Sequence, residues 1–472
     1  MKHLRSVAVL AALFSLWPAS RIPAAESAQR PNILFALADD WSWPHAGVYG
    51  DKVVKTPVFD RVAREGVLFT HVFCASPSCT PSRAAMLTGQ AIHRLEEGGN
   101  LWGTLPKRYP VYPDILEAAG YFVGHMGKGW GPGTIEGTGG SRNPAGPSFK
   151  SFSEFLKTVP MGKPFCFWYG SRDPHRPYVK DSGQKSGMDA SQVVVPSFLP
   201  NTPEVRSDIL DYYFAVQRYD HDVGEILRVL QEAGRLDNTI VVMTGDNGWP
   251  LPRAKANLYD AGTRQPLGVR WPARIKPGRT YDDFISLTDL APTFLEAAGL
   301  KPLPEMTGRS FLDRLLDKPS PARDRVFLER ERHANVRRGD LSYPCRALRT
   351  REFLYIRNFR PDRWPAGDPE KYKAVGDFGD VDASPSKEVI LSRRNDKEIA
   401  RYFQLAFAKR PAEELYDLGK DPGQLTNVAD QPTYAKTKQA LRTELERWMK
   451  ETGDPRATVD DDRWDKFPYF GR

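Results

Sequence analysis

The chain has 472 residues, of which 40% are hydrophobic and 27% charged, a composition typical of globular proteins and not of disordered ones. Its length suggests two or three domains. The net charge of +8 favours a negatively charged partner, but no dense Lys/Arg run with interleaved aromatic residues is present, so nucleic acid is not expected.

The N-terminus has the pattern of a secretory signal peptide. Lys2 and Arg5 precede an apolar run at residues 7–17, and small residues follow at 24–25. We therefore expect residues 1–25 to be removed, which lowers the net charge from +8 to +5. No later run is long enough for a transmembrane segment. These features predict an exported protein, located in the periplasm, outside the cell or in a lysosome-like compartment.

Apolar runs that end in polar groups recur along the first half of the chain. Residues 32–38 show no alternation, as expected of a strand buried on both faces of a parallel sheet, and they lead to Asp39 and Asp40. Three further runs lead to Lys128, to Asp173-Pro174-His175 and to Gly245-Asp246-Asn247-Gly248. Because ligands of open α/β sheets lie beyond the carboxyl ends of the strands, we expect these four ends to meet at one site.

The rest of the pattern predicts an α/β domain followed by a smaller α+β domain. We expect a catalytic domain at residues 26–325 and a C-terminal α+β subdomain at residues 326–472. The predicted helices cover residues 58–65, 204–232 and 287–298, and 129–147 should form a loop near the site opening. The second domain should contain strands at 326–328, 353–356 and 414–416, a surface insertion at 360–400 and a helix at 433–450.

Four side chains at the strand ends suggest a metal site. Asp39, Asp40, Asp246 and Asn247 offer only oxygen donors. Such a set favours Ca²⁺, with Mg²⁺ as the second choice. An Asp-Asp pair taken alone, however, is more typical of a solvated turn or a helix cap.

The segment around Cys79 has the features of a nucleophile at a helix start. Pro81 is tolerated in a first helical turn and residues 84–87 are good helix formers, so Cys79 should lie at the helix N-terminus with Arg83 one turn on. Backbone N–H groups and a guanidinium favour an anion there. The alternative is a buried structural cysteine beside a solvated arginine. With four cysteines in all, at most one disulfide is expected if Cys79 is used for chemistry.

The run Cys79-Thr80-Pro81-Ser82-Arg83-Ala84-Ala85-Met86-Leu87-Thr88-Gly89 resembles the signature of the type I sulfatases. In that family the cysteine is oxidised to Cα-formylglycine, whose hydrated aldehyde attacks sulfur. The resemblance implies a maturation enzyme as a partner. It also implies that one divalent cation is held by the carboxylates, the amide and residue 79, namely Asp39, Asp40, Asp246, Asn247 and Cys79.

Carried over position by position, the resemblance gives roles to four basic side chains. Arg83 would stabilise the formylglycine diol, Lys128 would bind the sulfate ester, His175 would serve the leaving group and Lys255 would bind sulfate oxygens. The implied fold is of the alkaline-phosphatase type, with a large α/β domain around a mostly parallel sheet and a small C-terminal domain with an antiparallel sheet and a helix.

One position departs from the family pattern. The family usually has Gly-Lys-x-His after the strand that leads to Lys128, and this chain has Trp130 in place of the histidine. That histidine assists the formylglycine hydroxyls, so its loss puts turnover in question. His125 is a nearby alternative, and the Trp130 ring is a candidate to stack on a sugar.

Several segments are similar to the heparan N-sulfatase (sulfamidase) branch, including Asp173-Pro174-His175-Arg176 and residues 195–203. The resemblance implies a sulfated oligosaccharide or polysaccharide substrate, with a terminal sulfated amino sugar bound in a pocket. Arg172, Arg176 and His333 are basic candidates for contacts with the substrate. The alternative functions are a phosphodiesterase or phosphonate hydrolase on the same scaffold, and a non-catalytic protein that binds sulfated polysaccharide.

Overall fold

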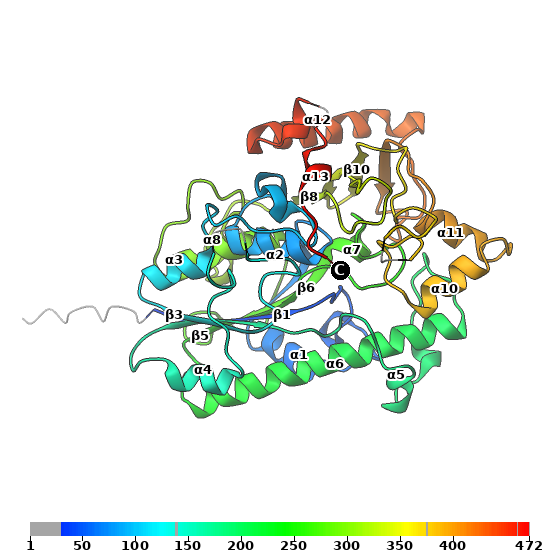
Figure 1. Ribbon diagram of the computed structural model, residues 1–472. Coiled ribbons are helices and arrows are strands. Elements are labelled where there is room, and N and C mark those ends of the chain that lie inside the picture. Colours follow the sequence, from blue (N-terminus) through cyan, green and yellow to red (C-terminus); the bar gives the residue numbers. More distant parts are fainter. Residues whose placement is uncertain (1–29, 137–139, 374–375, 460, 472) are drawn as a thin grey trace, which may run out of the picture.

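The computed structural model describes residues 30–136, 140–373, 376–459 and 461–471 (Figure 1). The signal peptide expected at residues 1–25 lies outside them. Across the described part of the chain, no helix combines the length and the apolar character that crossing a membrane requires.

A seven-stranded sheet forms the centre of the molecule, in the order β3-β4-β1-β5-β6-β2-β7. Only β6 is antiparallel to its neighbours, and the other pairs are parallel. The strands are β1 (Asn32–Ala38), β2 (Val67–Phe73), β3 (Phe122–Gly127), β4 (Phe165–Gly170), β5 (Thr239–Gly245), β6 (Arg264–Arg270) and β7 (Arg279–Ser286). The prediction of an α/β domain with a mostly parallel sheet is therefore confirmed.

Helices cover both faces of this sheet (Figure 1). On one face lie α1 (Pro57–Arg64), α4 (Phe152–Thr158) and α6 (Pro203–Glu232), and on the other lie α2 (Cys79–Thr88), α3 (Tyr112–Ala118) and α8 (Leu290–Ala297). In β1, Leu34 and Ala36 pack on the α6 side, whereas Phe35 and Leu37 pack on the α2 side. Strand β1 lacks alternation because both of its faces are buried.

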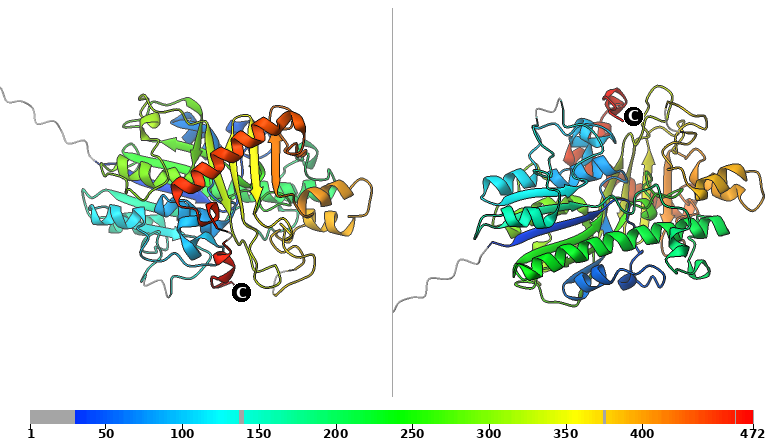
Figure 2. Two further views of the ribbon diagram at one scale, coloured as in Figure 1. Left: turned by 90° about the horizontal axis from the view of Figure 1, so that it is seen from above. Right: turned by 60° about the horizontal axis from the view of Figure 1, so that its bottom comes forward.

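A second sheet has four antiparallel strands in the order β11-β10-β9-β8. They are β8 (Arg325–Arg330), β9 (Cys345–Thr350), β10 (Phe353–Asn358) and β11 (Glu413–Asp417), and α12 (Ala435–Thr452) lies across one face (Figure 2). This confirms the predicted small antiparallel sheet with a helix. The domain boundary after residue 325 stays a prediction.

Strand β9 was not predicted, because a buried charge hides its pattern. Arg346, the second residue of the strand, is fully buried and binds Asp454 at 2.6 Å and Glu331 at 2.8 Å. Sequence patterns count an arginine as a surface residue, whereas here its partners make burial possible.

The prediction that residues 360–400 form a surface insertion is wrong. Phe378, Val381 and Ile390 are buried in the same core as α6, and Ser386 of α10 (Pro385–Ser392) donates a hydrogen bond to Asp208 of α6 at 2.6 Å. The sequence of this segment is rich in charged residues, which predicts a surface position. Its charged groups have partners inside the protein, so parts of the segment can be buried.

The shorter helices complete the fold. They are α5 (Ser182–Lys185), α7 (Asp260–Thr263), α9 (Leu312–Leu315), α11 (Ala400–Ala406) and α13 (Arg463–Lys466), with 3₁₀ turns at Gly47–Tyr49, Ile92–Arg94, Glu96–Gly99, Ala190–Gln192, Leu287–Asp289, Pro432–Tyr434 and Pro455–Ala457.

Candidate active site

The candidate site lies at the carboxyl ends of four neighbouring strands. Strands β3, β4, β1 and β5 are adjacent in that order and parallel, so the groups that follow them meet at one edge of the sheet. The turn after β1 and the turn after β5 are in direct contact, because the Asp40 N–H donates to Asp246 Oδ1 at 2.9 Å.

Two backbone features allow this close approach. Asp40 has a left-handed conformation with φ 72°, which is uncommon outside glycine but tolerated by Asp. At Gly245, a Cβ atom would lie 2.2 Å from the carbonyl oxygen of Trp41, so only glycine lets the end of β5 pack against the turn after β1.

Cys79 is the first residue of α2, and its side chain points into the carboxylate cluster. Its Sγ lies 3.4 Å from Asp39 Oδ1 and 3.9 Å from Asp40 Oδ1, and the residue is 2% exposed. Burial, together with the charge of Asp39, raises the pKa of the thiol well above its usual value. Unmodified Cys79 is therefore protonated and a weak nucleophile.

The acidic side chains and the amide fit a hard divalent cation. Ligand atoms of Asp39, Asp40, Cys79 and Asp246 all lie within 4.8 Å of one another. The amide nitrogen of Asn247 donates to Asp40 and to the Gly248 carbonyl, whereas its buried Oδ1 has no hydrogen-bond partner among the described residues. An unsatisfied carbonyl oxygen beside three carboxylates is a donor set that Ca²⁺ or Mg²⁺ accepts.

Three basic side chains balance the three carboxylates. Lys128 Nζ lies 2.7 Å from both oxygens of Asp39, Lys255 Nζ lies 2.7 Å from Asp40 Oδ2, and Arg83 Nε lies 2.8 Å from Asp246 Oδ2.

Burial and the nearby positive charges shift the pKa of Asp39 and the pKa of Asp246 in opposite directions. Burial raises the pKa of Asp39, but Lys128, His175 and Arg83 outweigh it and hold the pKa well below its usual value. At Asp246 burial outweighs the effect of Arg83, and the pKa is raised.

Arg83 connects three strand ends. Its side chain is completely buried, and besides Asp246 it binds the carbonyls of Lys128 and Gly129 at 2.7 and 2.9 Å and Asp39 at 3.4 Å. The planar guanidinium thus joins the end of β3 to the ends of β1 and β5.

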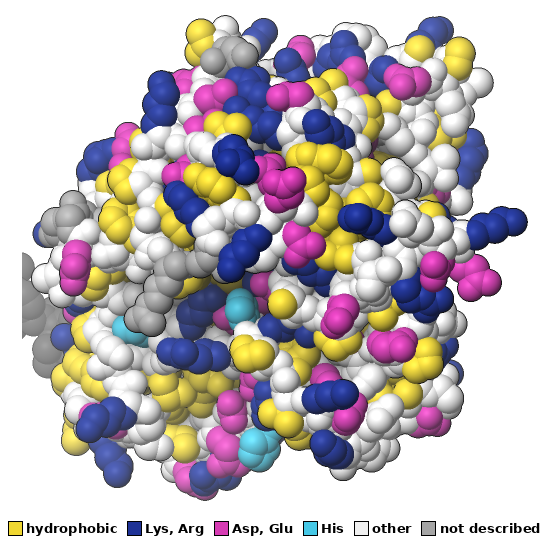
Figure 3. Space-filling view, turned by 45° about the vertical axis from the view of Figure 1, so that its right-hand side comes forward, with side chains coloured by type: hydrophobic (Ala, Val, Ile, Leu, Met, Phe, Trp, Pro, Cys, Tyr) yellow, Lys and Arg dark blue, Asp and Glu magenta, His cyan; other side chains and the backbone are white. Residues whose placement is uncertain are grey.

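His175 faces the opening of the site. Its side chain is 35% exposed, and its Nε2 lies 3.8 Å from Asp40 Oδ2. Its Nδ1 contacts the Arg176 carbonyl at 2.5 Å, so Nδ1 carries a proton and Nε2 is the atom turned to the site. One face of the molecule is hollowed where basic, acidic and histidine side chains gather (Figure 3).

Trp130 and His125 do not take the place of the missing histidine. Trp130 is 5% exposed and packs in the core beside α2, with its backbone held by Asn143. The hypothesis that the Trp130 ring stacks on a sugar is therefore wrong, because the ring is buried. His125 binds the carbonyl of Gly146 at 2.8 Å, which directs it into the neighbouring loop.

The three basic candidates for substrate contacts have different surroundings. Arg172 is exposed. Arg176 is 8% exposed in its side chain and binds Asp208 at 2.7 Å and the Pro250 carbonyl at 3.0 Å, so it is already engaged. His333 is buried, with Nδ1 2.8 Å from the hydroxyl of Ser78, the N-cap of α2, and burial lowers its pKa to about 4.

The structure adds a residue that the sequence did not indicate. Asp382, from the segment expected at the surface, has Oδ2 3.4 Å from Lys255 Nζ. No motif contains it, so only the folded chain could reveal it.

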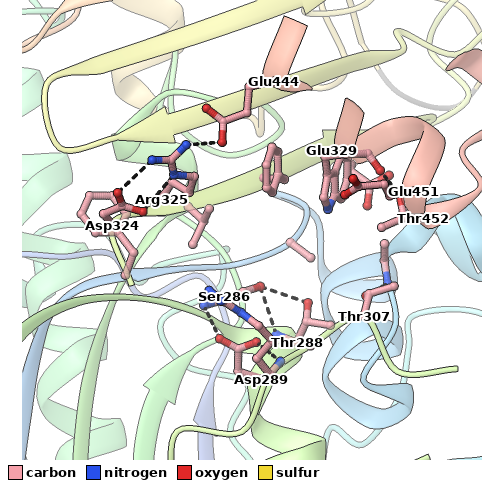
Figure 4. Close-up of a pocket in the computed structure, with 18 of the residues that line it drawn as sticks. Ser286, Thr288, Asp289, Thr307, Asp324, Arg325, Glu329, Glu444, Glu451 and Thr452 are labelled. Atoms are coloured by element: carbon pink, nitrogen blue, oxygen red, sulfur yellow. Dashed lines mark hydrogen bonds and ion pairs between the residues drawn. The ribbon is translucent and has the colours of Figure 1, made fainter. Parts of the chain in front are cut away.

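A separate cavity of about 480 Å³ lies between β7, β8 and α12 (Figure 4). Several of its charged side chains pair with neighbours: Arg325 with Asp324 and Glu444, and Asp289 with Arg323. None of the candidate catalytic residues lines it, so we do not assign the chemistry to this cavity.

Comparisons with known proteins identify the class. A sulfatase family model matches residues 31–135 and 146–300, and a model described as N-sulphoglucosamine sulphohydrolase, C-terminal, matches residues 245–373. The chain therefore belongs to the sulfatase family and is a sulfuric ester hydrolase, which confirms the resemblance seen in the sequence.

Two relatives match almost the whole chain. The human N-sulphoglucosamine sulphohydrolase is 31% identical over 90% of this chain and 91% of its own length. An ulvan-active sulfatase of Formosa agariphila is 31% identical over 90% of this chain and 81% of its own length.

Solved structures share the fold at lower identity. An enzyme in complex with its substrate, D-glucosamine-2-N,6-O-disulfate, aligns with a TM-score of 0.63 and 20% identity, covering 92% of this chain and 99% of that one. The phosphonate monoester hydrolase of Agrobacterium radiobacter aligns with a TM-score of 0.64 and 19% identity, covering 90% and 96%.

The contacts of Arg83 generate a prediction about stability. Arg83→Met leaves Asp246 buried beside the other carboxylates without its partner, and we expect a loss of about 3–5 kcal/mol in the free energy of unfolding. The double variant Arg83→Met/Asp246→Asn should recover a large part of that loss, because it also removes the unpaired charge. Urea denaturation of the three proteins measures this. Equal losses in the single and double variants would contradict a role in charge balance.

Proposed function

We propose that the protein is a formylglycine-dependent, Ca²⁺-dependent sulfatase that hydrolyses sulfate esters or sulfamates of sulfated glycans. The observation that carries the proposal is the position of Cys79. It begins a buried helix, and its sulfur atom lies within 4.8 Å of ligand atoms of Asp39, Asp40 and Asp246.

Asp39, Asp40, Asp246 and Asn247 would hold the cation, which would supply positive charge for the negative charge that develops in the reaction. A formylglycine at position 79 would supply the nucleophilic hydroxyl. In this proposal the site is matured by an enzyme that oxidises Cys79.

We assign sulfate binding, contact with the diol and proton donation to four basic side chains of the protein. Lys128 and Lys255 each lie 2.7 Å from a carboxylate of the cluster, Lys128 from Asp39 and Lys255 from Asp40, and we assign them to the sulfate oxygens. Arg83 is completely buried and pairs with Asp246 and Asp39, and we assign it to the formylglycine diol. His175 turns Nε2 to the site. When the ring is protonated, Nε2 carries a proton that it would donate to the leaving oxygen or nitrogen.

We propose a sulfated amino sugar at the end of a glycan chain as the substrate. Support comes from the match of the C-terminal family model and from the human relative, which is named an N-sulphoglucosamine sulphohydrolase. The ulvan-active relative is of similar identity, so an O-sulfated algal glycan is the competing substrate. We also propose export of the protein, on the basis of the signal-peptide pattern.

A substrate panel tests this proposal. We expect sulfate release from a disaccharide with terminal N-sulfated glucosamine, and slower release from 6-O-sulfated, 2-O-sulfated and ulvan oligomers. Cys79→Ala should abolish release from all of them with an unchanged melting temperature, because Ala fits at a helix start. Release from ulvan oligomers alone would overturn the amino-sugar assignment, and turnover of a phosphodiester in preference to every sulfate would overturn the sulfatase proposal.

Calcium binding gives a second prediction that does not depend on activity. Binding to the native state alone should raise the free energy of unfolding by about 2.7 kcal/mol when free Ca²⁺ is 100 times its Kd. Asn247→Leu removes the amide oxygen and should weaken this shift, whereas Asn201→Leu, at an exposed site outside the cluster, should keep it. Thermal unfolding with and without Ca²⁺ measures both. Equal shifts in the two variants would contradict the assignment of Asn247.

A further inference from the structure

Asp382 is a partly exposed carboxylate beside Lys255, the lysine that we assign to the sulfate oxygens. Its side chain is 30% exposed, and Oδ2 lies 3.4 Å from Lys255 Nζ. That oxygen is buried and has no hydrogen-bond partner within the described residues. Burial alone would raise the pKa of Asp382, but Lys255, His175 and His333 lower it to about 2, so the group is ionised and can only accept hydrogen bonds.

Two buried anchors hold the chain on the N-terminal side of Asp382. Asp380 is 2% exposed and binds Arg330 at 2.6 Å and Arg337 at 2.5 Å. The Lys387 ammonium donates to the carbonyl of Val381 at 2.8 Å. The residues directly before Asp382 are therefore fixed by charged groups inside the protein.

A third anchor holds the chain on the C-terminal side. Ser386 donates a hydrogen bond to Asp208 of α6, and Asp208 also binds Arg176. Arg176, expected from the sequence to meet the substrate, thus fixes the segment that carries Asp382. With anchors on both sides, the carboxylate is held in place before any ligand arrives.

The charge of Asp382 is unfavourable for sulfate itself. A carboxylate near Lys255 and His175 repels an anion that these side chains attract. Its position is consistent with substrate binding if it faces a part of the substrate that donates hydrogen bonds. On a glycan, those donors are the hydroxyl and N–H groups of the sugar that bears the sulfate.

We propose that Asp382 is a specificity-determining residue that accepts a hydrogen bond from a hydroxyl or N–H group of the sulfated sugar, next to the scissile bond. This inference rests on the proposed sulfatase function. It predicts a preference for sugars that carry a hydroxyl or N–H group next to the sulfate that is removed. Sugars with a second sulfate at that position should be disfavoured.

The test compares kcat/KM for a sulfated saccharide with kcat/KM for an aryl sulfate, which has no sugar donors. The saccharide is whichever member of the panel above the wild-type protein hydrolyses. Asp382→Ala should lower the ratio of the two values about 10- to 100-fold, the effect of losing a hydrogen bond to a charged group. Asp382→Asn keeps the shape and one acceptor and should give a smaller decrease.

The control is Glu388→Ala, which removes the same charge from an exposed position of α10 and should leave the ratio unchanged. Melting temperatures of all variants show whether the segment remains folded, and Asp382→Asn provides the test if Asp382→Ala does not fold. An unchanged ratio in both Asp382 variants, whether the two values fall together or not at all, would overturn the proposal. It would leave Asp382 as a residue that only positions Lys255.

Failure of the underlying function gives a different result. If the wild-type protein releases sulfate from neither substrate, the sulfatase proposal itself fails, and the role of Asp382 fails with it. If it cleaves the aryl sulfate and no saccharide, the sulfatase chemistry stands and the sugar contact of Asp382 is refuted.

Discussion

The structure of the site depends on the burial of three carboxylates at one edge of the sheet. Unpaired, such groups would repel one another and lose their hydration, at a cost larger than the stability of most domains. Arg83, Lys128 and Lys255 offset that cost by direct ion pairs. In the proposed function, the carboxylates would hold a cation and the basic side chains would bind the sulfate group.

The strand order is what makes this arrangement possible. Four neighbouring parallel strands deliver their carboxyl ends to the same place, and close backbone contacts at Gly245 and Asp40 bring two of the turns together. The helix that begins at Cys79 lies on one face of the sheet, and its first residue reaches the same edge. Each of these elements is ordinary for an α/β fold, and the chemistry comes from their shared edge.

The C-terminal half of the chain completes the site. His333 follows β8 and binds the N-cap of the Cys79 helix, and Asp382 reaches Lys255 from the segment anchored on α6. The residues that we propose for the sulfur chemistry and the one that we propose for the sugar contact therefore come from different parts of the sequence. The two reported relatives carry names for different glycans.

Local patterns predicted the central strands and the position of Cys79 at a helix start, because each is a contiguous run whose residues act together. The meeting of Asp39, Asp40 and Asp246 was predicted from the rule that parallel strands end at one edge of a sheet. Strand β9 and the segment around Asp382 were missed for one shared reason. Their polar residues, such as Arg346 and Asp380, are buried against charged partners outside their own segment, including Asp454 for Arg346 and Arg330 for Asp380, and a pattern in one stretch of sequence carries no record of such partners. Trp130 was misjudged as a candidate for sugar stacking for the related reason that burial is a property of the fold.

The central claim is that the site is built around an aldehyde derived from Cys79. The most direct measurement is the mass of the Cys79 peptide from protein that hydrolyses sulfate, produced beside a formylglycine-installing enzyme. The account predicts a peptide in which one oxygen has replaced the sulfur and two hydrogens, in a fraction that rises and falls with specific activity. Full activity in protein whose Cys79 remains entirely a thiol would contradict it.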